Sequence, residues 1–307
     1  MPCAPEPETI VSMAALATVK HVLVTGGNAG IGAALCRLLA TDHACHVYLG
    51  SRDAAKGAAA VDDIVAKYPA AANNIEVLVI DVNDDQSVAA AAAKLQETLK
   101  AHGAPLYALV NNAGVGLAHG DVGGPAGVVK TNYEGPKRVT HAMEPLIDPN
   151  GGRIVNTSSG AASNWLKRQD AATKELFSNP NLTLEELDAA VADWLSKEGA
   201  DLGHGGYGLS KAALSALTMV HAKAYPNLKV TSLSPGFIAT NMTKGFGAKL
   251  SPEQGCVSAL KCLFSDEVVS GCYYGSDGLR SPLTCSRDPG TPEYKGEPNP
   301  DPAVYNK

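Results

Sequence analysis

The amino-acid sequence predicts an α/β fold, in which a doubly wound parallel β-sheet carries helices on both faces. Short, nearly continuous apolar runs alternate with segments of helical periodicity, and 45% of the 307 residues are hydrophobic. Continuous apolar strands are typical of parallel sheets because both faces of such a sheet are buried. A glycine-rich turn separates the first apolar run from the first helical segment, which marks a sharp change of chain direction.

The predicted strands and helices follow one another along most of the chain. The first strand, HVLVTG (21–26), ends in glycine, and the helix after it has apolar residues at Ile31, Leu35, Leu38 and Leu39. Further strands are predicted over 46–50, 75–81, 106–114, 152–159 and 228–236, with a last one within GCYYGSDG (271–278). Further helices are predicted over 53–67, 84–101, about 125–147 and 207–225.

These elements predict a single domain over residues 20–280. An N-terminal extension (1–19) precedes it, without the basic segment of a signal peptide or the arginines of a transit peptide. A C-terminal arm (281–307) follows and is rich in proline. The arm shows little periodicity, so it is expected to be extended or disordered.

The composition argues against several classes of protein. The net charge is −6 and Lys and Arg form no run, so no nucleic-acid partner is expected. No run of 18 apolar residues occurs, so no membrane span is expected. The 7 cysteines form neither a CxxC pair nor a Cys/His cluster at zinc spacing. This predicts no metal site, and free thiols in a reducing, cytoplasmic environment.

Ligands of doubly wound sheets bind beyond the carboxyl ends of the strands, where the first candidate is TGGNAGIG (25–32). In this turn Gly26, Gly30 and Gly32 follow a strand and open a helix. Glycine lets the backbone approach a ligand closely, and a helix N-terminus offers free N–H groups and a positive dipole end. The turn is predicted to bind a pyrophosphate; glycines needed only for a tight turn would give the same pattern.

The second strand ends in YLGSRD (48–53), where NAD enzymes tend to carry an acidic residue. This chain has Ser51 and then Arg52. A guanidinium pairs with a 2′-phosphate and a carboxylate repels it, so NADP(H) is the predicted cofactor. Asp53 is expected in the first turn of the next helix. The third and fourth strand ends place the following residues along the cofactor: Asp81, Val82, Asn111, Ala113 and Gly114.

A tyrosine precedes a lysine by four positions three times, as Tyr133–Lys137, Tyr207–Lys211 and Tyr225–Lys229. Residues four apart stack on one face only within a continuous helix. Glycine and proline lie within the first pair, and proline and asparagine within the third. The second pair enters AALSALTMVHAKA, a strong helical pattern, so it is the pair predicted to share a helix face.

The chain resembles the short-chain dehydrogenase/reductase family through six motifs that occur in the family's order. They are TGGNAGIG (25–32), NNAG (111–114), TNYEG (131–135), IVNTSSG (154–160), YGLSK (207–211) and SPGFIAT (234–240). The resemblance covers about 20–245 and implies one doubly wound domain of the Rossmann type with a nicotinamide cofactor. By motif match it implies a catalytic tetrad of Asn132, Ser159, Tyr207 and Lys211. Alignment of NTSS with the family pattern selects Ser159 over Ser158.

The same match implies a set of residues that contact the cofactor. They are Gly26, Asn28, Gly30, Ile31, Gly32, Ser51, Arg52, Asp81, Val82, Asn111, Ala113, Gly114, Tyr207, Lys211, Pro235, Gly236, Ile238 and Thr240.

The tetrad implies how a carbonyl group would be reduced. Tyr207 would donate a proton to the carbonyl oxygen, and Ser159 would hydrogen-bond the same oxygen. A nearby ammonium at Lys211 is expected to lower the pKa of Tyr207 from its ordinary value near ~10. Lys211 would also hold ribose hydroxyls of the cofactor, and Asn132 would position a water that links Lys211 to solvent.

The segment between Ser159 and Tyr207 is much longer than in most of the family, with an insertion over about 161–205. Thr183 and Glu186 predict a capping box that begins a helix, with Leu182 and Leu187 as a hydrophobic staple. The apolar stripe of this helix is expected to pack rather than to bind a ligand. Its members are Leu184, Leu187, Val191, Trp194 and Leu195.

An insertion at this position resembles the carbonyl reductase branch of the family, including the plant menthone and salutaridine reductases. The branch implies an NADPH-dependent reductase of ketones or aldehydes that is a monomer and acts on a small molecule. Trp165, Phe237 and Tyr273 are candidates for the wall of the substrate pocket. Two alternatives remain: an NAD-dependent alcohol dehydrogenase, which Asp53 supports, and an NADP(H)-binding redox-sensing regulator without turnover.

Overall fold

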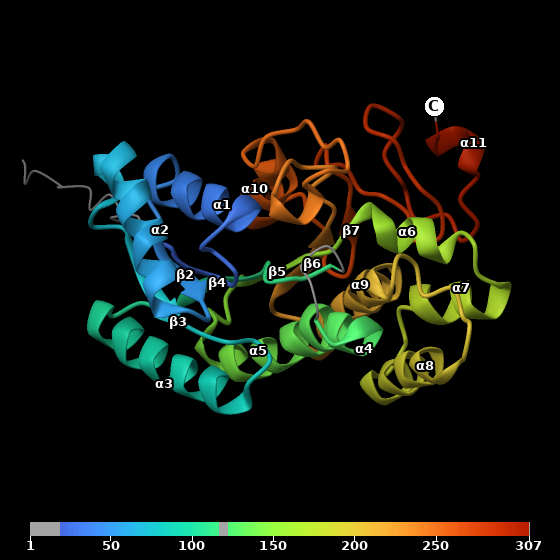
Figure 1. Ribbon diagram of the computed structural model, residues 1–307, viewed down its shortest axis with the longest axis horizontal. Helices are drawn as coiled ribbons and strands as arrows, with labels where there is room; N and C mark the ends of the chain where they lie inside the picture. The colour runs from blue at the N-terminus through green and yellow to red at the C-terminus, as the bar shows by residue number, and fades with distance from the viewer. Residues whose placement is uncertain (1–18, 117–121, 307) are drawn as a thin grey trace, which may run out of the picture.

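A single parallel β-sheet forms the centre of the protein. The computed structural model describes residues 19–116 and 122–306, and within these its seven strands lie in the order β3-β2-β1-β4-β5-β6-β7 (Figure 1). The strands are β1 (His21–Val24), β2 (His46–Ser51), β3 (Ile75–Val79), β4 (Leu106–Asn111), β5 (Arg153–Thr157), β6 (Lys229–Leu233) and β7 (Tyr273–Tyr274). The strand order reverses direction between β1 and β4, which is where doubly wound sheets bind their ligands. The predicted fold class is confirmed.

Helices cover both faces of the sheet. The helices α1 (Gly30–Thr41), α2 (Ala54–Lys67) and α10 (Val257–Phe264) cover one face, and α3 (Asp85–His102), α5 (Gly135–Met143) and α9 (Tyr207–Ala224) cover the other (Figure 1). The remaining α-helices are α4 (Gly124–Val129), α6 (Gly160–Leu166), α7 (Ala171–Ser178), α8 (Leu184–Ser196) and α11 (Pro302–Tyr305). Crossover helices on both faces explain why the strands are apolar throughout.

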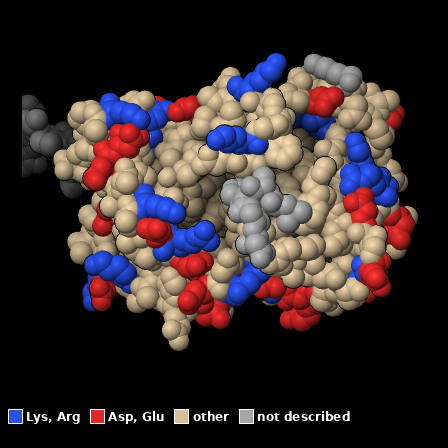
Figure 2. Space-filling view, in the orientation of Figure 1, with Lys and Arg blue, Asp and Glu red and all other residues tan. Residues whose placement is uncertain are grey.

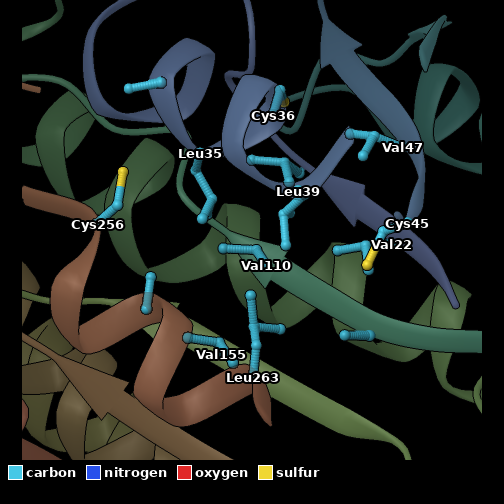
Figure 3. Close-up of a cluster of buried hydrophobic side chains, with 14 of the residues drawn as sticks. Val22, Leu35, Cys36, Leu39, Cys45, Val47, Val110, Val155, Cys256 and Leu263 are labelled. Carbon is cyan, nitrogen blue, oxygen red and sulfur yellow. The ribbon is translucent and has the colours of Figure 1, made fainter. Parts of the chain in front are cut away.

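The core beneath α1 and α10 is built from aliphatic side chains and thiols. Figure 3 shows Leu35 and Leu39 of α1 pointing at strand residues such as Val110, with Leu263 of α10 packed nearby. Cys36, Cys45 and Cys256 lie in the same cluster and behave as small apolar residues (Figure 3).

The six cysteines within the described residues are all free thiols. Burial raises the pKa of Cys45 to about 11 and that of Cys256 to about 12. A thiol reacts as its thiolate, so these groups are unreactive at neutral pH.

The segment predicted as one helix over about 125–147 differs from that prediction. It consists of α4, a π-helical turn (Lys130–Glu134), α5 and a short 3₁₀ turn (Glu144–Leu146). Pro136 and Pro145 stand near the start of α5 and of the 3₁₀ turn. Proline lacks the N–H that continues an α-helical hydrogen-bond pattern, so the chain changes helix type at these positions.

The insertion packs against α9. Thr183 and Glu186 form the predicted capping box at the start of α8, and the predicted stripe of α8 is buried or partly buried in one cluster with α9. Helices α6, α7 and α8 together cover the side of α9 that faces away from the sheet (Figure 1).

Asp188 of α8 fastens the insertion to the domain. Its carboxylate accepts a hydrogen bond from the Tyr133 hydroxyl at 2.7 Å and one from Lys137 Nζ at 2.6 Å. Tyr133 and Lys137 form the first of the three Tyr–Lys pairs, and the chain is helical through Gly135 and Pro136 rather than broken there. This pair therefore holds the insertion.

The C-terminal arm is packed rather than disordered, although it has little regular structure. Tyr305 is buried, and its carbonyl accepts the backbone N–H of Asp288 at 2.8 Å. The side chain of Arg287 is fully buried and pairs with Asp277 at 2.7 Å. Turns and side-chain contacts order this segment, which sequence periodicity does not reveal.

Within the part of the chain that the structure describes, no helix is long and apolar enough to cross a membrane.

Candidate active site

Tyr207 and Lys211 lie one turn apart at the start of α9, beside the carboxyl end of β5. Lys211 is buried, and its Nζ donates a hydrogen bond to the Thr157 carbonyl at 2.7 Å. The helix begins at Tyr207 because Gly206 before it has φ 93°, and a methyl group there would lie 2.9 Å from the Pro125 Cα. Only glycine fits this close, left-handed turn.

Ser158 and Ser159 follow β5 but face different environments. The Ser158 hydroxyl is buried, hydrogen-bonded to the Lys211 carbonyl at 3.0 Å and to the Ser215 hydroxyl at 2.7 Å. Ser159 is only partly buried, and its side chain lies near that of Tyr207. It is also the N-cap of α6, accepting the Ala161 N–H at 3.1 Å. The strand alternation thus buries the first serine and directs the second towards Tyr207.

Asn132 lies in the π-helical turn and is completely buried. Its amide accepts the Val115 N–H at 2.8 Å and donates to the Val115 carbonyl at 2.9 Å. It also donates to the Ser210 hydroxyl at 3.1 Å, next to Lys211 on α9. π-Helical turns are rare and often occur at functional sites. Here the turn connects the loop after β4 to α9.

The four tetrad residues converge on the loop that follows NNAG. A methyl group at Gly114 would lie 3.1 Å from Asn132 Oδ1 and 3.4 Å from Lys211 Nζ, and one at Gly116 would lie 3.8 Å from the Tyr207 ring. With Ser159 near Tyr207, these contacts bring together residues that follow β4 and β5 and residues of the π turn and α9.

The acid–base properties of the pair differ in part from expectation. Burial raises the pKa of Tyr207, and the hydrogen bond with Ser159 opposes this rise. Burial lowers the pKa of Lys211 to about 8. The expected lowering of the Tyr207 pKa by Lys211 does not occur here, because the loss of water around the phenol outweighs the favourable contacts. At neutral pH Tyr207 is therefore protonated and most Lys211 is charged.

The N-terminus of α1 is open for an anion. Ala29 stands at the N-cap, no described side chain caps the helix, and its first turn holds no acidic residue. A cavity of about 500 Å³ borders this end and is lined by Gly30, Thr240 and residues up to Ala248. Figure 2 shows a hollow near the centre of this face, close to where α1 and the ends of β4 and β5 lie in Figure 1, with Lys and Arg side chains on its rim.

Two residues that the sequence analysis did not single out hold the glycine turn in place. The Thr25 hydroxyl accepts the backbone N–H groups of Asn112 and Ala113 at 3.0 and 3.1 Å. The Asn112 side chain donates to the carbonyls of Thr25 at 3.0 Å and Gly26 at 3.2 Å. Both residues belong to motifs that are visible in the sequence: Thr25 is the first residue of TGG and Asn112 is the second of NNAG.

At the end of β2 the structure separates the roles of three neighbours. The Ser51 side chain is buried and hydrogen-bonds the Asp53 carbonyl at 2.8 Å. Asp53 is the N-cap of α2 and accepts the Lys56 N–H at 3.0 Å. Arg52 is exposed and forms no ion pair within the described residues. Its guanidinium is thus available to a phosphate, whereas the Asp53 carboxylate already caps a helix.

The remaining predicted cofactor residues occupy the same edge of the sheet, with one difference. Asp81 and Val82 follow β3, and the Asp81 carboxylate accepts the Asn83 N–H at 2.9 Å. The Asn111 side chain does not face the edge: it is buried and donates to Thr140 at 3.1 Å and Asn156 at 2.9 Å. Only its backbone is placed to meet a ligand.

The loop after β6 closes the site beside α1. A methyl group at Gly30 would lie 3.2 Å from Thr240, so Thr240 borders the glycine turn. Asn28 and Ile31 belong to that turn and are partly buried. Gly236 has φ 92°, and Pro235 precedes it. Ile238 is buried, so its side chain packs inside the loop.

Of the three candidates for the substrate wall, Trp165 is excluded. Its side chain is fully buried, its indole N–H donates to the Asp201 carbonyl at 2.6 Å, and its ring packs on Phe177 and Trp194. Phe237 is about half exposed. Tyr273 lines a polar cavity of about 330 Å³ between α6 and the C-terminal arm.

These residues fit a nicotinamide dinucleotide with a 2′-phosphate. The open α1 N-terminus suits the pyrophosphate, and the unpaired Arg52 suits the 2′-phosphate. The missing side chain at Gly114 leaves space beside Lys211 Nζ.

Comparisons with known proteins identify the family of this chain. Residues 20–172 match the family described as short chain dehydrogenase. The chain is 32% identical over 290 residues to (+)-neomenthol dehydrogenase of Arabidopsis thaliana, covering 84% of this chain and 96% of that one. It is 32% identical over 257 residues to carbonyl reductase (NADPH) 1 of Homo sapiens, covering 76% and 87%.

A solved structure extends the likeness to three dimensions. Salutaridine reductase from Papaver somniferum matches with a TM-score of 0.70 and 27% identity, over 83% of this chain and 99% of that one. The chain is an oxidoreductase of the short-chain dehydrogenase/reductase family, and carbonyl reductases are among its relatives.

Proposed function

We propose that the protein reduces a ketone or aldehyde to an alcohol with NADPH, and that Tyr207 is the general acid. The observation that carries this proposal is the convergence of these side chains on one loop. Lys211 Nζ lies 5.7 Å from the Tyr207 ring centroid, the Ser159 side chain lies near Tyr207, and Asn132 and Lys211 both border Gly114. The acid Tyr207, the hydrogen-bond donor Ser159 and the cation Lys211 thus lie together at the edge of the sheet where the open end of α1 suits a dinucleotide.

Each residue of the tetrad has a defined part in this proposal. When bound, the reduced nicotinamide supplies hydride. Tyr207 donates its phenolic proton to the carbonyl oxygen, and Ser159 donates a hydrogen bond to the same oxygen as negative charge develops on it. Tyr207 carries its proton at neutral pH, as a proton donor must. Lys211 stabilises the phenolate that remains after proton transfer.

Asn132 acts through Lys211 and the loop after β4 rather than on the substrate. Its NH₂ group donates to the Val115 carbonyl and the Ser210 hydroxyl, and its oxygen accepts the Val115 N–H, which leaves one acceptor position on that oxygen. It therefore holds the π-helical turn against α9, and a water between Asn132 and Lys211 is the proposed path by which the proton is replaced.

NADPH is proposed over NADH because of Arg52. Its guanidinium is exposed and unpaired within the described residues, and Asp53 is already occupied as a helix cap. The human relative is named as an NADPH enzyme, which points the same way. A cytoplasmic location is also proposed, on the basis of the six free thiols.

The test follows absorbance of reduced nicotinamide with a panel of ketones, aldehydes and quinones, using NADPH and NADH in parallel. Consumption of NADPH that depends on a carbonyl substrate is expected. Turnover only of alcohols with NAD⁺ would favour the alcohol dehydrogenase alternative. Tight NADPH binding with no turnover of any compound would favour a redox-sensing regulator.

A further inference from the structure

A cluster of imidazoles lies at the amino ends of the strands, far from the tetrad. His21 opens β1 and His46 opens β2, and the two are directly paired across the sheet. Glu76 lies in β3 beside them, and His102 is the last residue of α3, which covers this face. The active site lies at the opposite, carboxyl ends of the same strands.

Three of these side chains bring potential metal ligands close together. One ligand atom each from His46, Glu76 and His102 lies within 4.8 Å of the other two. His46 Nε2 and Glu76 Oε1 are 2.9 Å apart. In a tetrahedral zinc site, neighbouring ligand atoms stand roughly 3.3 Å apart, given bonds of about 2.0–2.1 Å. His102 ends its helix and is exposed, so its side chain is free to rotate towards the other two ligands.

His21 forms the inner wall of the cluster rather than a ligand. Its ring centroid lies 5.2 Å from that of His46 and 4.9 Å from that of His102. Its Nδ1 is hydrogen-bonded to the Tyr48 hydroxyl at 2.9 Å. His21 and Tyr48 are both buried and pack on the inner side of His46, whereas His102 is exposed to solvent.

The chemistry of the three side chains is that of a transition-metal site. Two imidazoles and one carboxylate, with a fourth position left to water, are a known ligand set for Zn²⁺. Imidazole favours zinc over magnesium or calcium, which prefer oxygen ligands. A structural ion pair between His46 and Glu76 would explain the 2.9 Å contact by itself. Ring packing places His102 beside them, with its centroid 5.0 Å from that of His46, so a third ligand is within reach of the pair.

We propose that His46, Glu76 and His102 form a binding site for a divalent transition-metal ion, Zn²⁺ in particular, at the amino-terminal edge of the sheet. The bound ion joins β2 and β3 to the end of α3. Because an ion that binds the folded chain and not the unfolded one stabilises the fold, zinc raises the unfolding temperature. The spacing of the three residues along the chain hides the site from a sequence search.

The experiment uses the full chain without a polyhistidine tag, freed of metal with a chelator. Zinc chloride is titrated against it by calorimetry, and Co²⁺ is added separately so that its visible absorption reports ligand geometry. One ion per chain is expected, with a dissociation constant in the low micromolar range or below. His102→Ala should bind at least tenfold more weakly, and Glu76→Gln should do the same.

A control variant and a measurement of unfolding temperature test whether zinc binds at these three residues. His141→Ala removes an exposed histidine from α5 and should bind zinc as the wild type does. Zinc should raise the unfolding temperature of the wild type and of His141→Ala, but not that of His102→Ala, whose cooperative unfolding checks that it is folded. Binding only at millimolar zinc, or equal binding by His102→Ala, would overturn the proposal.

Discussion

Lys211 Nζ lies 5.7 Å from the centroid of the Tyr207 ring, one turn along α9, and is buried with the Thr157 carbonyl as its hydrogen-bond acceptor. The cation thus stands beside the phenol without contacting its oxygen as a partner. In the proposed mechanism it stabilises the charge that appears when Tyr207 loses its proton. Before that step, burial favours the protonated phenol.

Tyr207→Phe removes the proposed proton donor and leaves the ring in place. A loss of kcat of about a hundredfold or more is expected, because a general acid contributes on that scale. NADPH affinity, measured by fluorescence titration, should stay nearly unchanged. Tyr225→Phe, at the other end of α9, is the control and should keep normal turnover. Near wild-type kcat in Tyr207→Phe would refute the assignment.

Arg52→Asp replaces the unpaired guanidinium by a carboxylate that repels a phosphate. The ratio of kcat/KM for NADPH to that for NADH should fall about tenfold or more, which corresponds to about 1–3 kcal/mol for a charge-assisted contact. Steady-state kinetics with both cofactors measure this ratio. If the wild type already prefers NADH, the role given to Arg52 is wrong.

Asp188→Ala should weaken the attachment of the insertion. It leaves the Tyr133 hydroxyl and Lys137 without their carboxylate partner. Both charged groups are partly exposed, so the expected loss is about 1 kcal/mol in the free energy of unfolding, measured in urea. The matched control is Asp193→Ala, which breaks a surface pair with Lys197 on the same helix. Equal losses in the two variants would show that the contact to Tyr133 adds nothing.

Stability should fall with acid, partly because of His221. This histidine on α9 is buried, its Nδ1 has no hydrogen-bond partner among the described residues, and burial lowers its pKa to about 4. The unfolded chain binds a proton near pH ~6.5 and the folded chain only near pH 4, so stability present above pH ~6.5 is lost as pH falls towards 4. The limit of this effect is about 3 kcal/mol.

The measurement is the free energy of unfolding in urea at pH 7, 6 and 5. His221→Leu removes the titrating group, so its stability should depend less steeply on pH over this range than that of the wild type. Identical slopes in the two proteins would contradict the role of His221.

The protein is predicted to be a monomer. Helices α6, α7 and α8 cover the side of α9 that faces away from the sheet, so that side is no longer open to a second subunit. Light scattering at micromolar concentration should give a mass near 31.6 kDa. A stable dimer or tetramer would refute the prediction.

The sequence by itself determined the sheet, the glycine turn and the helix that carries Tyr207 and Lys211. These features depend on short-range patterns: apolar runs, glycines at strand ends, and residues four apart on a helix. The capping box at Thr183 and Glu186 is local in the same sense, which is why it was predictable before α8 was placed.

Tertiary structure alone decided the rest, because it brings together groups that are far apart in the sequence. Trp165 became a core residue through Phe177 and Trp194, and the proline-rich arm became ordered through contacts such as that of Arg287 with Asp277. The pKa of Tyr207 depends on burial, which no motif encodes. Likewise His46, Glu76 and His102 meet only because parallel strands start at one edge and α3 returns its last residue to it.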